Sequence, residues 1–190
     1  MNDSTRDEIA IGDRAPDFQL PGAGGERQAL GGGEGGGEGG GGGGGGGPTV
    51  VVFTCNHCPY ALAWHDRIAQ AARDYLGRAR FLAINSNDAE RYPADSFDAM
   101  KERIAVEDWP MPYLHDETQA VARAYGARTT PDVFIVDAEG VLRYRGAPDS
   151  DYSDPTQNAA WLRDALDALL EGRDPDPAET EPVGCSVKWK

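Results

Sequence analysis

Apolar residues along this chain fall into two patterns, short continuous runs and longer segments with helical spacing. The continuous runs are rich in Val, Ile and Phe, which is typical of buried β-strands. The predicted strands are 18–20, 49–54, 81–85, 133–136 and 141–144. The last two are joined by Asp137-Ala138-Glu139-Gly140, whose glycine suits a hairpin turn, so we expect them to pair antiparallel.

Four segments show the spacing of amphipathic helices. The predicted helices are 59–76, 97–104, 117–125 and 157–170. Ser96 is a suitable N-cap for the second helix, and Gly77, Gly126 and Gly172 are suitable stops for the other three. Strands that alternate with helices predict an α/β fold, with parallel strands first and an antiparallel pair at the end. We therefore expect one domain, residues 1–190, built on a central mixed β-sheet flanked by helices.

Two segments depart from this pattern. Residues 31–47 are all glycine except Glu34 and Glu38. Such a segment buries no apolar surface and loses much entropy when ordered, which predicts a flexible loop. Residues 173–190 form a C-terminal tail that is first acidic and rich in proline and then changes to Cys-Ser-Val-Lys-Trp-Lys.

The formal net charge is −14 and the pI is about 4.5. Strong acidity argues against nucleic acid and against anionic membranes as partners, because both need a basic surface. Aspartate outnumbers glutamate and lysine is scarce, a composition of proteins from salt-loving microbes or simply of a soluble protein from a GC-rich genome. The N-terminus lacks the features of a signal peptide, and no apolar run is long enough to span a membrane. We expect a cytoplasmic protein.

Cys55 and Cys58 are the chemical centre of the sequence. They follow the strand at 49–54 directly, and Pro59 occupies a position that suits the first turn of the next helix. Unpaired N–H groups and the helix dipole at a helix start favour an anion, and a thiolate is one. Such placement lowers a cysteine pKa from about 8.5 to roughly 3.5–7.5. The pattern predicts a redox-active dithiol.

Four segments resemble one family, the thioredoxin-like redoxins, a group within the thioredoxin superfamily that includes alkyl hydroperoxide reductases and thiol-specific antioxidant proteins. The segments are Cys55-Asn56-His57-Cys58, Gly12-Asp13-Arg14-Ala15-Pro16-Asp17-Phe18, Thr129-Thr130-Pro131 with the strand after it, and Gly184-Cys185-Ser186-Val187-Lys188-Trp189-Lys190. The resemblance implies a thioredoxin-like fold and no cofactor. It also implies a disulfide or peroxide substrate, either protein or small molecule, and a reductase as electron donor.

The resemblance assigns roles to the motif residues. Cys55 is expected to be the nucleophile and the more accessible thiol, and Cys58 to resolve the mixed disulfide. A cationic His57 would stabilise the Cys55 thiolate, although a loop histidine without this role is the alternative. Pro131 matches a cis-proline beside the dithiol, and Thr130 would present its backbone to the substrate.

The chain departs from thioredoxins proper at two places, and a third cysteine has two possible roles. Thioredoxins proper carry a buried carboxylate where this chain has Thr49, so another acidic residue or water must accept the proton of the second thiol. Asn56-His57 replaces their Gly-Pro pair. Cys185 is either a third redox thiol or a small packing residue in a tail that docks through Val187 and Trp189.

The reading we favour is a thiol–disulfide oxidoreductase that acts through a mixed disulfide. One alternative is a thiol peroxidase in which Cys55 becomes a sulfenic acid, although the threonine of the peroxidase signature is misplaced. The other is a non-catalytic zinc-binding or docking module that uses Cys55, His57, Cys58 and Cys185. We predict no metal, because no second Cys-x-x-Cys or His pair accompanies the motif. Residues 85–88 either line a substrate groove or form a capped turn.

Overall fold

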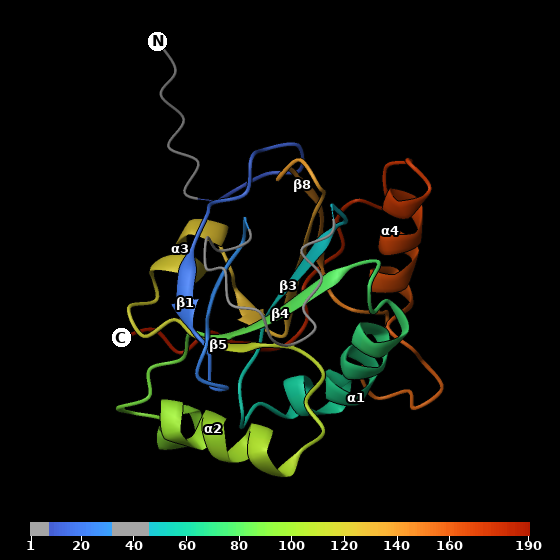
Figure 1. Ribbon diagram of the computed structural model, residues 1–190. Coiled ribbons are helices and arrows are strands. Elements are labelled where there is room, and N and C mark those ends of the chain that lie inside the picture. Colours follow the sequence, from blue (N-terminus) through green and yellow to red (C-terminus); the bar gives the residue numbers. More distant parts are fainter. Residues whose placement is uncertain (1–7, 32–45) are drawn as a thin grey trace.

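The structure is a computed structural model that describes residues 8–31 and 46–190 (Figure 1). The predicted glycine-rich loop at 31–47 falls almost entirely outside the described residues. Within them, no helix is long and apolar enough to cross a membrane.

The described chain contains nine strands, four α-helices and one short 3-10 helix. The strands are β1 (Gln19–Pro21), β2 (Arg27–Ala29), β3 (Thr49–Phe53), β4 (Arg80–Asn85), β5 (Tyr113–His115), β6 (Thr129–Thr130), β7 (Asp132–Val136), β8 (Leu142–Gly146) and β9 (Cys185–Ser186). The helices are α1 (Pro59–Asp74), η1 (Pro93–Asp95), α2 (Phe97–Val106), α3 (Ala120–Tyr125) and α4 (Ala160–Leu170).

A five-stranded mixed sheet in the order β5-β4-β3-β7-β8 forms the centre of the molecule. β3 pairs parallel with β4, and β4 pairs parallel with β5. β7 joins the other side of β3 antiparallel and then pairs antiparallel with β8. The predicted mixed sheet, with its parallel start and closing hairpin, is confirmed. β1 and β2 form a separate antiparallel pair beside it.

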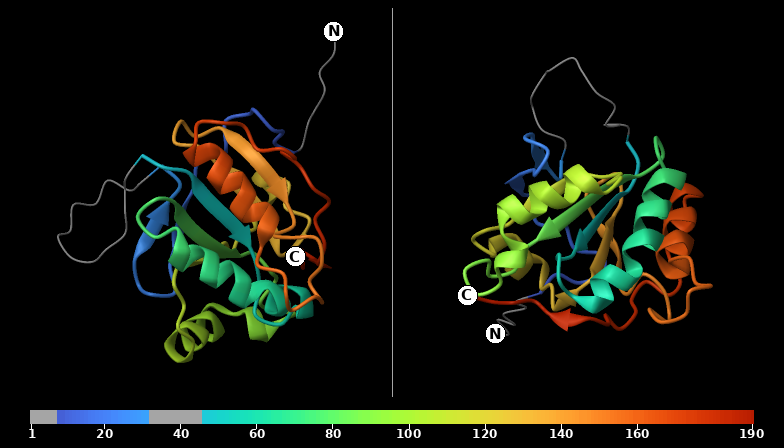
Figure 2. Two further views of the ribbon diagram at one scale, coloured as in Figure 1. Left: turned by 90° about the vertical axis from the view of Figure 1, so that its right-hand side faces the viewer. Right: turned by 90° about the horizontal axis from the view of Figure 1, so that it is seen from below.

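Helices cover both faces of this sheet, as Figures 1 and 2 show. Alternate residues of β3 point to opposite sides, since side chains alternate along a strand. Val50 and Val52 belong to the larger apolar cluster, which α1, α2 and α4 cover. Val51 and Phe53 belong to the other cluster, which contains residues of α3. β3 is buried along its whole length, so it anchors whatever follows it.

The four predicted helices exist; α1, α3 and α4 are shorter than their patterns, and α2 extends two residues further, to Val106. α3 starts at Ala120 rather than at 117, and α4 at Ala160 rather than at 157. In each case the residue before the helix has a positive φ of 62°, which ends the helix in the N-terminal direction. The side chain of Ser96 caps α2 as predicted, because its hydroxyl oxygen accepts a hydrogen bond from the N–H of Ala99.

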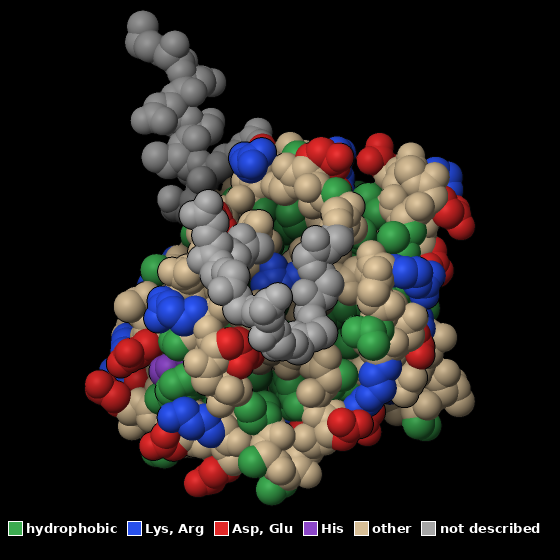
Figure 3. All heavy atoms as spheres, viewed as in Figure 1, with side chains coloured by type: hydrophobic (Ala, Val, Ile, Leu, Met, Phe, Trp, Pro, Cys, Tyr) green, Lys and Arg blue, Asp and Glu red, His purple; other side chains and the backbone are tan. Residues whose placement is uncertain are grey.

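Two leucines that fit the helical spacing of 59–76 lie outside the core. Leu62 on α1 and Leu76 beyond its end are exposed, and Trp64 is buried instead. The Trp64 indole N–H donates to the buried Asp149 carboxylate at 2.7 Å, which satisfies its only polar atom. Figure 3 shows acidic and basic side chains interspersed over one face of the molecule, in keeping with the absence of a basic footprint in the sequence.

Candidate active site

The two cysteines of the motif lie where β3 ends and α1 begins. Cys58 is the N-cap of α1 and Pro59 occupies its first turn, as the sequence predicts. Both thiols are free, and both residues are fully buried. The expectation that Cys55 is the more accessible thiol is therefore wrong for this structure. Thr130 and the tail strand β9 are adjacent to the cluster that Cys55 and Cys58 form.

Thr130 contacts both sulfur atoms. Its hydroxyl lies 3.4 Å from the Sγ of Cys55, and its carbonyl oxygen accepts a hydrogen bond of 3.1 Å from the Cys58 thiol. The Thr130–Pro131 peptide bond is cis, which confirms the expected conformation. Because a carbonyl oxygen has no proton to give, this contact holds a proton on Cys58 in the reduced pair.

The two thiols titrate as one system. The hydrogen bond with Cys58, and then burial, raise the pKa of Cys55 well above its usual range, and the Asp95 carboxylate adds to the rise. The same thiol–thiol contact lowers the pKa of Cys58 to about 4. The pair therefore gives up one proton readily and keeps the other. Two contacts compete for the retained proton, since the Thr130 carbonyl favours it on Cys58 and the Asp95 charge favours it on Cys55.

Three side chains outside the motif hold the turn between the cysteines. The backbone N–H of Asn56 donates to Asp95 at 2.6 Å. The side-chain oxygen of Asn56 accepts from the Tyr113 hydroxyl at 2.9 Å and from Arg103 at 3.2 Å. Arg103 also donates to the carbonyl of Cys55. The Asn56-His57 pair thus gives the turn anchors that a Gly-Pro pair would lack.

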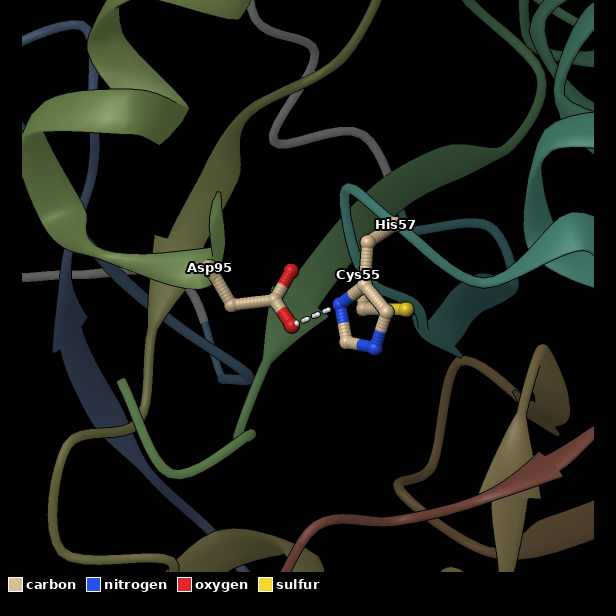
Figure 4. A group of neighbouring side chains, drawn as sticks. All are labelled: Cys55, His57 and Asp95. Carbon is tan, nitrogen blue, oxygen red and sulfur yellow. Dashed lines mark ion pairs between the residues drawn. The ribbon is translucent and has the colours of Figure 1, made fainter. Parts of the chain in front are cut away.

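The Nδ1 of His57 faces the carboxylate of Asp95, and the imidazole lies beside the Cys55 side chain (Figure 4). Its Nδ1 lies 2.6 Å from the Oδ2 of Asp95, the distance of an ion pair although not the alignment of a hydrogen bond. The imidazole also stacks on Tyr92, with ring centroids 5.3 Å apart. The electrostatic role of His57 stays a prediction, and its partner is a residue that the sequence analysis did not identify.

Asp95 lies in η1, and its side chain is fully buried. Asn85 and Asn87 donate to its two oxygens at 3.2 and 2.9 Å. Residues 85–88 are buried, so the interpretation of this segment as a groove lining is wrong. The segment supports Asp95 instead. An acidic residue just before a helix is a common pattern, and no local signal distinguished Asp95 from an exposed one.

Among the described residues, one group has the composition of a metal site. Ligand atoms of Cys55, His57 and Asp95 lie within 4.8 Å of one another. This set differs from the zinc set considered from the sequence, which had Cys58 and Cys185 in place of Asp95. Structural zinc sites have four protein ligands, so this group of three would need a fourth.

Cys185 lies next to the dithiol although it is far away in sequence. β9 pairs antiparallel with β6, and the register places Cys185 opposite Thr130. The Cys185 side chain packs against the cluster that contains Cys58, and its proximity contributes to the low pKa of Cys58. Burial, and then Cys58, raise the pKa of Cys185 to about 11. The structure thus brings Cys55, Cys58, Thr130 and Cys185 into one cluster.

The tail beyond Cys185 is docked, as one of the two interpretations of the tail predicts. Val187 is buried, and its N–H donates to the Arg128 carbonyl at 3.1 Å. The Lys188 N–H donates to Asn87, and its carbonyl accepts from Gln119. Trp189 packs against the second core cluster. Docking and proximity to Cys58 are both present, so the two interpretations of this segment are compatible.

The fold and the dithiol at the strand-to-helix junction define the class of a thioredoxin-like redoxin. The sequence model of the AhpC/TSA family matches residues 11–145, and the chain belongs to this family. No curated protein sequence matches the chain. Membership of the family supports thiol redox activity.

Solved structures agree with this assignment. An uncharacterized conserved protein from Geobacillus kaustophilus is 37% identical, with a TM-score of 0.83 over 95% of this chain and 93% of its own. A hypothetical protein from Sinorhizobium meliloti 1021 is 33% identical, with a TM-score of 0.82 over 96% of both chains. Peroxidoxin BcpB from Mycobacterium tuberculosis is 17% identical, with a TM-score of 0.58 over 87% of this chain and 98% of its own, and shares the fold.

Proposed function

We propose that this protein is a thiol–disulfide oxidoreductase whose redox centre is the pair Cys55 and Cys58. The observation that carries the proposal is the contact of one residue, Thr130, with both sulfurs at the start of α1. Two thiols that share a proton within one buried cluster form and break a disulfide without moving the backbone elements that hold them.

The proposed cycle starts with the retained proton on Cys58, where the contact with the Thr130 carbonyl favours it, and with the negative charge on Cys55. The Cys55 thiolate attacks one sulfur of a substrate disulfide and expels the other sulfur as a thiolate. Cys58 then loses its proton and attacks the Sγ of Cys55. The second substrate thiolate leaves, and a disulfide joins Cys55 and Cys58. A reductase dithiol returns two electrons and restores the reduced pair. We place this cycle in the cytoplasm, where such a reductase is available.

Reduction of insulin disulfides, with a small dithiol as the electron source, tests the proposal. We expect turnover by the wild type and none by Cys55→Ser. Cys58→Ser is the matched variant, because it keeps the nucleophile and loses the resolving thiol, so it should accumulate a mixed disulfide with insulin. Full turnover by Cys55→Ser would overturn the mechanism.

A second candidate, thiol peroxidase, is favoured by the complete burial of Cys55. A hydroperoxide is small enough to reach a buried sulfur, whereas a protein disulfide needs an opening. Cys55 would become a sulfenic acid, and Cys58 would condense with it to the same disulfide with loss of water. Peroxide consumption measured alongside insulin reduction distinguishes the oxidoreductase from the peroxidase.

The alternative of a metal-binding module has its own test, which is the zinc content of protein purified under reducing conditions.

A further inference from the structure

The strand β9 occupies the edge of β6 next to the dithiol. It contributes Cys185 opposite Thr130 and Ser186 opposite Thr129, in an antiparallel register. Thr130 is also the residue that contacts both Cys55 and Cys58. The tail therefore lies where an extended peptide with a cysteine would lie in order to meet the dithiol, because a strand added to an open edge takes its register from the backbone.

Gly184 shows that this approach is close. A Cβ on Gly184 would lie 2.3 Å from the carbonyl oxygen of Thr130, a distance that no real side chain tolerates. The tail backbone thus runs against the Thr130 carbonyl, which also accepts the hydrogen bond from the Cys58 thiol. On the other side of Cys185, the backbone N–H groups of Val187 and Lys188 donate hydrogen bonds to Arg128 and Asn87. The position of Cys185 is held from both sides.

Exposure differs among the three thiols. Cys55 and Cys58 are fully buried, whereas Cys185 is partly exposed and packs against their cluster. The Thr130 carbonyl, which the tail approaches closely at Gly184, contacts Cys58, whereas Cys55 contacts the Thr130 hydroxyl. Cys58 is therefore the sulfur that we expect to exchange with the tail.

We propose that Cys185 is a third redox thiol that exchanges with the oxidised pair to give a disulfide between Cys58 and Cys185. The inference rests on the proposed function, since it begins from the disulfide between Cys55 and Cys58. The Cys185 thiol releases its proton to solvent, and the thiolate attacks the Sγ of Cys58. A bond forms between these two sulfurs, the bond between Cys55 and Cys58 breaks, and its electron pair stays on Cys55 as a thiolate. The number of disulfides is unchanged, so no outside oxidant is consumed in this step.

The test is disulfide mapping after oxidation with oxidised glutathione and trapping of free thiols by an alkylating reagent. Tryptic cleavage after Arg67 and Arg173 leaves Cys55 and Cys58 in one peptide and Cys185 in another. We expect the wild type to contain both the disulfide within the first peptide and the cross-link between the two peptides. Cys55→Ser should form the cross-link through Cys58. Cys58→Ser should form it at least tenfold less, since the tail runs against the carbonyl that contacts Cys58 rather than Cys55.

The geometry is tested by Gly184→Ala, with Val183→Ala, at the exposed residue just before it, as the matched control. The added methyl should push the tail from Thr130 and slow cross-linking roughly 10- to 100-fold, whereas the control should cross-link at the wild-type rate. No cross-link in the wild type and in Cys55→Ser, or equal cross-linking of Cys58→Ser, would overturn the inference. If the tail cross-link is absent but the wild type still reduces insulin, the proposed function stands and the inference about Cys185 fails. If no disulfide forms at all, the proposed function and the inference both fail.

Discussion

Asp95 supplies a negative charge beside Cys55 from an element that lies forty residues further along the chain. Its carboxylate raises the pKa of Cys55, whereas a cationic His57 would lower it. The two groups lie 2.6 Å apart, so each offsets the action of the other on the sulfur. Their balance therefore modulates the pKa of Cys55 beyond the larger effects of the contact with Cys58 and of burial.

The first prediction concerns His57→Ala. The substitution removes the imidazole and leaves the Asp95 carboxylate without its partner, so both effects should destabilise the Cys55 thiolate. We expect Cys55 to titrate at higher pH and the reduction potential of the dithiol to become more negative. One pKa unit is about 1.4 kcal/mol, which corresponds to roughly 30 mV for this two-electron couple. A glutathione redox titration and the pH dependence of thiolate absorbance measure the two quantities.

His65→Ala is the matched control, because that imidazole pairs with Glu107 instead, at 3.3 Å. The reduction potential of the dithiol in His65→Ala should equal that of the wild type. An unchanged potential and an unchanged Cys55 pKa in His57→Ala would show that His57 has no electrostatic role in the redox centre.

The sequence was sufficient to locate Cys55 and Cys58, because two cysteines at this spacing before a helix have a physical reason. Thr130 was located only through the resemblance to the redoxins. The sequence was not sufficient for Asp95. Burial of that carboxylate depends on Asn85 at the end of β4, on Asn87 in the loop after it, and on the turn at Asn56. Contacts of this kind arise from tertiary packing and leave no periodicity in the chain.

β7 begins with a second buried carboxylate. Asp132 is fully buried, and its Oδ1 has no hydrogen-bond partner in the described part of the molecule. Its Oδ2 accepts from the N–H of Arg128 at 3.0 Å. Burial raises the pKa of Asp132 to about 7, against the smaller opposing effect of that hydrogen bond. The strand therefore starts on a group that is uncharged in mildly acidic solution.

The second prediction is a fall in stability as the pH rises. Between the unfolded pKa of about 3.9 and the folded value of about 7, the folded protein binds a proton that the unfolded chain has lost. The stabilisation is complete below pH 4 and is lost as the pH passes 7. Asp132→Asn cannot ionise, so it should lose less stability than the wild type between pH 5 and pH 8, by roughly 2–3 kcal/mol. Urea denaturation at both pH values measures the difference.

Asp164→Asn on the exposed face of α4 is the control, and its loss of stability over this interval should match that of the wild type. Equal pH dependence of Asp132→Asn and the wild type would mean that Asp132 is ionised in the folded protein across the whole interval.

Elements were predictable in proportion to their length. β3 and β4 form continuous apolar runs, and α1 has helical spacing of apolar residues. The positions of all three were confirmed. β6 and β9 have two residues each, too few for any pattern, and they pair across more than fifty residues of chain. The sequence analysis could therefore name Cys185 but could not decide whether it reaches the dithiol.

The whole molecule carries a formal charge of −14. Many of its arginines are already engaged in ion pairs with acidic side chains, among them Arg67 with the buried Asp149. The remaining acidic groups repel one another, and this repulsion destabilises the compact state more than the expanded one. Salt shortens the range of the repulsion to about 10 Å at 0.1 M and about 3 Å at 1 M.

The third prediction is that salt stabilises the protein. We expect the melting temperature to rise by several degrees between 0.05 and 1 M sodium chloride, since about 1 kcal/mol shifts it by roughly 2–4 °C in a chain of this size. Choline chloride at equal ionic strength separates screening from specific binding of sodium and should give the same rise. A melting temperature that falls with either salt would show that ion pairs outweigh repulsion in this molecule.

The close contact between Gly184 and the Thr130 carbonyl also limits how this protein can change over evolutionary time. A mutation of Gly184 to any other residue would force the tail away from β6 and would separate Cys185 from Cys58. Natural selection on Cys185 would then relax, and its codon would drift. The glycine and the cysteine should therefore be inherited together or lost together among descendants, whereas a packing role for Val187 and Trp189 alone would let the two positions vary independently.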